Sequence, residues 1–114
     1  MNTPLTFNQY QRESAKTAIY PGQNTVQGLL YCGLGMGEAG EVQGKIKKVL
    51  RDDDGILTAE RRDQIIDELS DVLWYCAQMA TELNTTLGDV ALRNLEKLSA
   101  RKKAGTIKGS GDKR

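Results

Sequence analysis

The sequence of 114 residues contains no histidine, and this absence narrows the chemistry that the protein can perform. Serine and cysteine nucleophiles that depend on an imidazole base are excluded, as are H-E-x-x-H zinc helices and mixed Cys/His zinc sites. A ferritin-like di-iron site is excluded too, because it needs Glu-x-x-His on two helices. An enzyme with this sequence must therefore use carboxylates, lysines, arginines or a bound metal.

Cysteine and long apolar runs are also scarce. Cys32 and Cys76 lie too far apart in the sequence for a C-x-x-C pair, so free thiols in a reducing compartment are expected. No apolar run approaches the ~20 residues of a membrane span. The first residues lack the basic and apolar regions of a signal peptide. We therefore expect a cytoplasmic protein without membrane contact.

Positive charge is concentrated at the C-terminal end of the chain. Residues 1–92 carry eight basic and thirteen acidic side chains, whereas residues 93–114 carry eight basic and two acidic ones. The basic end is interpreted either as a solvated tail or as a clamp for an anionic ligand. A net charge of only +1 and an aromatic content of 5% argue against a dedicated nucleic-acid binder.

Breaks in the sequence divide the chain into about four helices, over residues 7–18, 25–50, from Thr58 to about residue 83, and from Thr86 to about Gly105. In the third, apolar residues recur every three or four positions, which predicts packing against other helices: Ile65, Leu69, Val72, Cys76, Met79 and Leu83. The prediction is one all-α domain over residues 1–114. It is a helical bundle completed by oligomerisation, with a basic Gly/Lys-rich tail from about residue 105.

Two pairs of acids indicate a metal site. Glu38 and Glu41 are three residues apart on the second helix, and Glu68 and Asp71 are three apart on the third. Each pair therefore shares a helix face, and both pairs border apolar positions that a bundle buries. Four converging carboxylates need a cation, and an all-oxygen ligand set favours Mg²⁺ or Mn²⁺. The alternative is that both pairs lie on solvated faces.

A glycine-rich stretch, residues 35–40, matches the dinucleotide fingerprint G-x-G-x-x-G. The fingerprint requires further parallel strands, whereas helices are expected on both sides of this stretch. A phosphate-binding P-loop is excluded, because Ala39 occupies the position of its first glycine and Ile46 that of its Ser/Thr. We interpret these glycines as small residues that allow a neighbouring helix to approach closely.

Residues 37–42, Gly-Glu-Ala-Gly-Glu-Val, and 67–75, Asp-Glu-Leu-Ser-Asp-Val-Leu-Trp-Tyr, resemble the MazG-like nucleotide pyrophosphohydrolases. That family is all-α, and its signature is E-x-x-E, a spacer, then E-x-x-D. The ending of the chain, from Asn94 onwards, is similar to that of short single-domain members. The resemblance implies that a (deoxy)nucleoside triphosphate is hydrolysed to the monophosphate and pyrophosphate. It also implies a homodimer or homotetramer.

By the same resemblance, the four acids bind Mg²⁺, and Glu38 or Glu41 also activates the attacking water. Asn94, Lys97 and Arg101, which share one helix face, are implied as phosphate contacts, supported by the tail residues Lys108 or Arg114. Tyr75 is one turn beyond Asp71 and is expected to touch the substrate or to pack. Gln11, on the first helix, is expected as a base contact, and Trp74 is expected in the core or in a subunit interface.

Two other classes of function stay open on the sequence alone. A non-catalytic helical interaction module with a basic tail predicts exposed acids that are indifferent to metal. A nucleic-acid binder that uses residues 93–114 predicts salt-sensitive binding to DNA.

Overall fold

The computed structural model describes residues 3–105 together with residues 108 and 109. These residues form five α-helices and one short 3₁₀ helix, and within them there is no strand. The helices are α1 (Phe7–Ala15), α2 (Val26–Gly35), α3 (Ala39–Asp52), α4 (Ala59–Glu82) and α5 (Leu87–Ala104), with the 3₁₀ helix η1 (Met36–Glu38) between α2 and α3. The predicted all-α fold is confirmed.

Threonine begins four of these helices. The Oγ1 atoms of Thr6, Thr25, Thr58 and Thr86 each accept a hydrogen bond from a backbone N–H in the first turn of α1, α2, α4 and α5. Each cap satisfies one of the N–H groups that a helix start leaves without a partner. At the other end of α5, Gly105 takes a left-handed conformation with φ of 72°, which suits glycine. The expected starts at Thr58 and Thr86 are confirmed.

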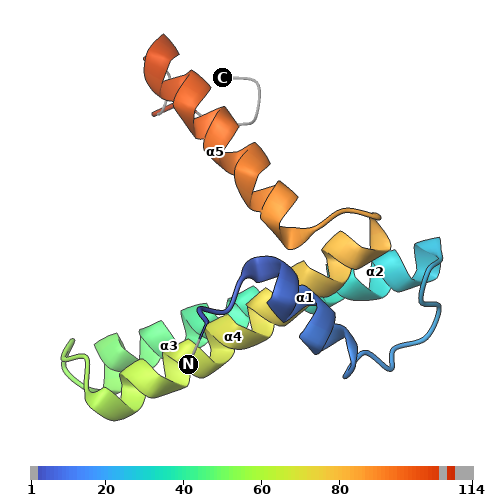
Figure 1. Cartoon of the computed structure of the whole chain (residues 1–114). Coiled ribbons are helices and arrows are strands. Elements are labelled where there is room, and N and C mark those ends of the chain that lie inside the picture. Colours follow the sequence, from blue (N-terminus) through green and yellow to red (C-terminus); the bar gives the residue numbers. More distant parts are fainter. Residues whose placement is uncertain (1–2, 106–107, 110–114) are drawn as a thin grey trace.

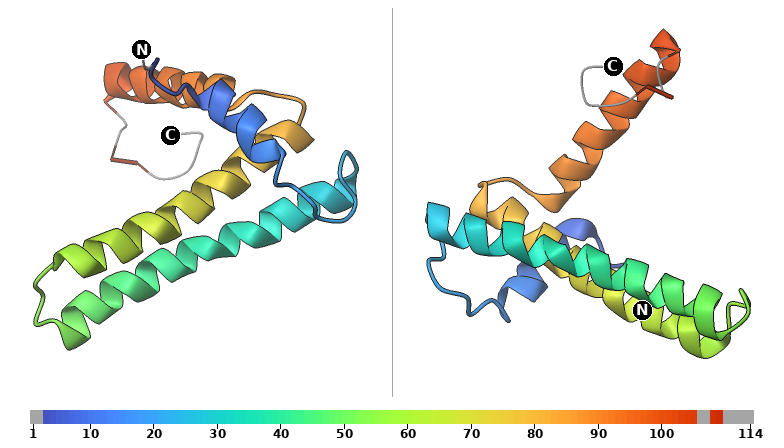
Figure 2. Two further views of the ribbon diagram at one scale, coloured as in Figure 1. Left: turned by 60° about the horizontal axis from the view of Figure 1, so that its bottom comes forward. Right: turned by 180° about the vertical axis from the view of Figure 1, so that it is seen from behind.

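The expected second helix, residues 25–50, is interrupted. It consists of α2, η1 and α3, which follow one another along a nearly common line beside α4 (Figure 2). The interruption falls in the glycine-rich stretch, where helix propensity is lowest. At Gly35 the ring of Tyr75 from α4 lies against the backbone, so close that a Cβ would be 2.1 Å from its Cε1 atom. The interpretation of close packing is therefore confirmed at Gly35, whereas a Cβ added at Gly37 or Gly40 would have no described atom of another part of the chain within 4 Å.

Helix α4 is the centre of the fold. It packs against α1, α2, η1 and α3 and makes a smaller contact with α5. Figure 1 shows α4 running beside α2 and α3, while α1 crosses it and α5 projects away from this layer. The most deeply buried side chains of the C-terminal half of α4 are Ala77, Gln78 and Ala80. The fold of one chain is thus a thin layer around α4 rather than a closed bundle.

The apolar periodicity of α4 does not mark its most buried face within one chain. Leu69 and Leu83 of the predicted seam are 56% and 55% exposed, and the other four seam residues are only half-buried. The predicted face is only partly packed within one chain, because α5 leaves the layer instead of returning along this face (Figure 1).

Candidate functional site

Three of the four predicted acids converge where η1 meets the middle of α4. Glu38 is the last residue of η1, and Glu68 and Asp71 lie one turn apart on α4. Packing of η1 against α4 brings the two segments together. One carboxylate oxygen from each of the three residues lies within 4.8 Å of the others. Glu38 and Glu68 are half-buried, and Asp71 is exposed.

This donor set fits a hard divalent cation. Two oxygens bound to one Mg²⁺ at about 2.1 Å each lie at most about 4.2 Å apart, close to the limit found for these three oxygens. Carboxylates from two elements, partly exposed, also leave room for water or substrate oxygens. Glu41, on the first turn of α3, is exposed and is not part of the group among the described residues. The structure thus brings together three of the four predicted ligands.

Tyr75 lies beside this group. Its ring packs on Gly35, and together with Glu38 and Asp71 it lines an open pocket of about 440 Å³. Burial raises the pKa of the Tyr75 hydroxyl, and Tyr31, Glu38 and Asp71 raise it further. Burial also raises the pKa of Tyr10 on α1, with smaller contributions from Cys76 and Asp71. Both phenols therefore stay protonated and able to donate a hydrogen bond at neutral pH.

The other two side chains of the pocket are Thr17 and Trp74. The indole N–H of Trp74 donates to Thr17 Oγ1 at 2.9 Å. Trp74 was expected in the core or in an interface, but it is half-buried and lines this pocket. Thr17 was missed by sequence reasoning. It follows α1 and is 57 residues from Trp74, so no local pattern connects the two.

The residues predicted to contact phosphate lie on α5, away from this pocket. Asn94 is exposed, Lys97 is half-buried and Arg101 is buried. Helix α5 packs against α1 and α4 and projects from the layer that holds the acids (Figure 1). Lys108 is exposed, and Arg114 lies outside the described residues. Among the described residues α5 contacts α1 and α4 but not η1, so within one chain Asn94, Lys97 and Arg101 are not brought to the acids.

The expectation that Gln11 contacts a base is wrong. Gln11 is buried, and its amide N–H groups donate to Thr81 Oγ1 and to the Thr85 carbonyl, both at 3.0 Å. Its amide oxygen accepts from the backbone N–H of Leu87 at 2.6 Å. The side chain therefore fixes α1 to the end of α4, to the following turn and to the start of α5.

Fold and site together define an all-α protein with a convergent carboxylate group beside an aromatic pocket. The profile of the MazG nucleotide pyrophosphohydrolase domain matches residues 30–106, which include all three convergent acids. The chain therefore belongs to the MazG nucleotide pyrophosphohydrolase family. It is 50% identical over 109 residues to the "Gene 37 protein" of Mycobacterium phage L5, covering 92% of this chain and 96% of that protein. No solved structure matches the chain.

No helix in the described part of the chain is both long enough and apolar enough to cross a membrane.

Proposed function

We propose that the chain hydrolyses (deoxy)nucleoside triphosphates between the α- and β-phosphates and releases the monophosphate and pyrophosphate. The observation that carries this proposal is the convergence of Glu38, Glu68 and Asp71 beside an open pocket, in a member of the MazG family. House-cleaning of the cytoplasmic nucleotide pool is the role that we assign to this reaction.

In this proposal Glu38, Glu68 and Asp71 hold Mg²⁺, which Mn²⁺ can replace. Such an ion neutralises charge on phosphoryl oxygens and makes a bound water more acidic. Glu41 stands one helical turn beyond Glu38 and completes the acidic set when the side chains adjust to the ion. Either Glu38 or Glu41 orients and deprotonates the attacking water. These roles can be filled without a histidine, because phosphoryl transfer depends chiefly on positioning and charge stabilisation.

We also propose that the working form is a homodimer or homotetramer. On α4 a groove of about 520 Å³ is almost wholly apolar, and it is lined by Ile66, Leu69, Ser70, Val72, Leu73 and Cys76. On α5 four more apolar side chains are exposed, namely Val90, Leu92, Leu95 and Leu98. Exposed apolar surface on this scale is typical of subunit contacts. A second copy supplies the layer that one chain lacks.

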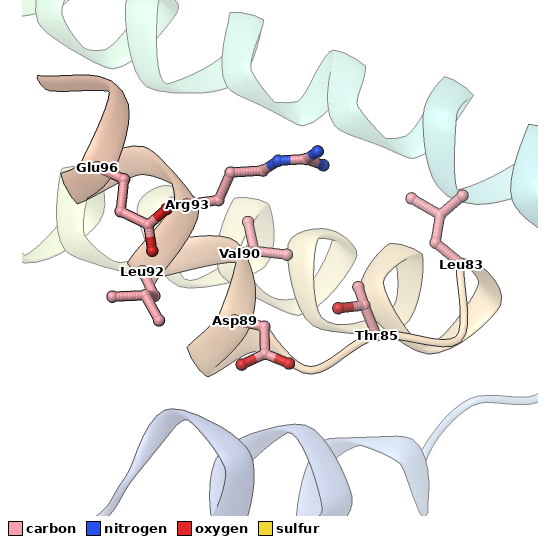
Figure 3. Close-up of a pocket in the computed structure, with 7 residues that line it drawn as sticks. All are labelled: Leu83, Thr85, Asp89, Val90, Leu92, Arg93 and Glu96. Atoms are coloured by element: carbon pink, nitrogen blue, oxygen red, sulfur yellow. The ribbon is translucent and has the colours of Figure 1, made fainter. Parts of the chain in front are cut away.

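The junction of α4 and α5 is also partly apolar. Figure 3 shows an open pocket there, in which Leu83, Val90 and Leu92 supply apolar walls. Arg93 and Glu96 project from α5 at its edge (Figure 3). Because α5 reaches away from the acids of its own chain, we propose that Asn94, Lys97 and Arg101, with Lys108 and Arg114, contact phosphate at the site of another subunit.

The reaction is tested with a panel of NTPs and dNTPs in the presence of Mg²⁺. The expected product is pyrophosphate, in equal amount to the nucleoside monophosphate. Orthophosphate as the first product would overturn α–β cleavage. No turnover of any nucleotide would favour the non-catalytic interaction module instead.

The metal ligands are tested by thermal melting with and without Mg²⁺ in the absence of nucleotide. Mg²⁺ at millimolar concentration is expected to raise the melting temperature, since a ligand that binds only the folded state stabilises it. Glu68→Gln should abolish that shift. Asp67→Asn is the matched control, because it removes a neighbouring exposed charge outside the convergent group and should keep the shift. A shift unchanged by Glu68→Gln would contradict the assignment.

The assembly is tested by light scattering after gel filtration. Leu69→Glu places a charge in the apolar groove of α4 and is expected to give monomers. Ile56→Glu changes a comparably exposed apolar residue in the α3–α4 turn and should leave the assembly intact. A monomeric wild-type protein would refute the proposed assembly.

A further inference from the structure

The aromatic side chains of this chain are few and are gathered beside the acids. The sequence has one tryptophan, four tyrosines and one phenylalanine. Tyr20 stacks on Tyr31 with ring centroids 5.0 Å apart, and Trp74 meets Tyr20 and Tyr75 edge to face at 6.4 and 5.1 Å. Four of the six aromatic rings thus form one cluster, of which Trp74 and Tyr75 line the pocket that holds Glu38 and Asp71.

Trp74 is held in a fixed orientation by contacts within the protein. Its N–H donates to Thr17 Oγ1, and the Thr17 hydroxyl in turn donates to the carbonyl of Ser14 at 2.7 Å. Because the hydroxyl proton is committed to Ser14, the oxygen faces the indole as an acceptor. The edge-to-face contacts with Tyr20 and Tyr75 restrict the ring from two further directions. The pocket therefore has a preorganised aromatic wall.

The order of residues along α4 places the acids and the aromatic side chains at successive positions along the helix. Glu68 and Asp71 supply the acids, and Trp74 and Tyr75 follow one turn later, about 5 Å further along the helix axis. In a nucleoside triphosphate the sugar is joined directly to the α-phosphate. A metal that acts on the α–β bond and a side chain that contacts the base must therefore be separated by about the length of one sugar. The aromatic wall stands at such a position.

On this basis, and resting on the proposed function, we propose that Trp74 contacts the nucleoside of the substrate and that Thr17 is the positioning residue for its indole. The phosphates lie over the acids, and the base lies at the end of the pocket nearer α1. The pocket volume of about 440 Å³ is in the usual range for small-molecule sites. Stacking on an aromatic ring accepts every base, so this contact supplies affinity without selecting one base.

The single tryptophan provides a direct test. Titration with an α,β-imido dNTP in the presence of Mg²⁺ should change the emission of Trp74, whereas inorganic pyrophosphate, which has no nucleoside, should change it much less. Calorimetry then compares the affinities of variants for both ligands. Trp74→Ala should weaken binding of the imido nucleotide at least about fivefold, the lower range of base stacking, and leave binding of pyrophosphate unchanged.

Thr17 is tested with a pair of variants. Thr17→Val removes the acceptor of the indole N–H while keeping the shape of the side chain, and Thr17→Ser restores it. For hydrolysis, Thr17→Val should raise KM with little change in kcat, and Thr17→Ser should return KM toward the wild-type value. Equal KM values for the two variants would refute the positioning role.

Two outcomes separate this inference from the proposed function. Equal affinity of wild type and Trp74→Ala for the imido nucleotide, or an equal loss of nucleotide and pyrophosphate binding, would overturn the nucleoside contact even if pyrophosphate is released. Conversely, a selective loss of nucleotide binding in an enzyme that releases orthophosphate would support the contact and refute α–β cleavage.

Discussion

Gly35 ends α2 and packs against the ring of Tyr75 at the candidate site. The effect of replacing it by alanine on stability follows from the distances at this contact. The added Cβ would lie 2.1 Å from Cε1 and 2.3 Å from Cδ1 of Tyr75. Ordinary van der Waals contact begins at 3.4 Å, so the ring must move by about 1.3 Å. Overpacking of this kind typically costs about 1–3 kcal/mol. The gain in helix propensity offsets up to about 1 kcal/mol.

We therefore expect Gly35→Ala to lower the free energy of unfolding by about 1–2 kcal/mol in urea denaturation. Gly44→Ala is the control, because Gly44 lies inside α3 and no described atom lies within 4 Å of the added Cβ. That variant should be stabilised by up to about 1 kcal/mol. Activity should also fall in Gly35→Ala alone, since Tyr75 borders Glu38. Equal stability of the two variants would refute the reasoning.

Three further predictions concern contacts that hold the fold. Gln11→Ala leaves the Leu87 N–H without its acceptor and should lower the free energy of unfolding by about 2 kcal/mol, with faster hydrogen exchange at the start of α5. Burial, and then the hydrogen bond to Glu82, raise the pKa of Tyr20. Because tyrosine in the unfolded chain titrates near 10, the protonated Tyr20 hydroxyl contributes its full stabilisation below about pH 10 and loses it as the pH rises further. The melting temperature should therefore fall above about pH 10, and Tyr20→Phe should make that fall less steep. Thr58→Ala removes the N-cap of α4 and should cost about 1 kcal/mol by denaturation, whereas Thr58→Ser should cost much less.

Local signals predicted the helices well. Thr58 and Thr86 were recognisable as N-caps because their side chains act on backbone N–H groups within the same turn. The break at η1 was not predicted, although it falls in the glycine-rich stretch, and the contact beside it joins residues 40 apart in the sequence, the ring of Tyr75 and Gly35. Nor was the departure of α5 predicted, since periodicity marks an apolar face but not the element that covers it.

The site was predictable where its residues share a helix turn. Spacing placed Glu68 and Asp71 together, but nothing local determined that Glu38 joins them while Glu41 lies outside the group. Gln11 was misassigned for a related reason. A side-chain amide on a helix is equally suited to a ligand or to other protein groups, and here the end of α4, the following turn and the start of α5 use it.

Helix α4 carries acidic and apolar side chains on neighbouring sides, and this arrangement places the proposed subunit contact beside the site. Glu68 and Asp71 are each next to an apolar groove residue in the sequence, Leu69 and Val72. Successive side chains on a helix are about 100° apart, so in the proposed assembly a partner seated on the groove would contact α4 next to the side of the helix that carries both carboxylates. The chain has few aromatic residues and no histidine. Its acids are oriented by helix packing, and its one tryptophan is oriented by a threonine.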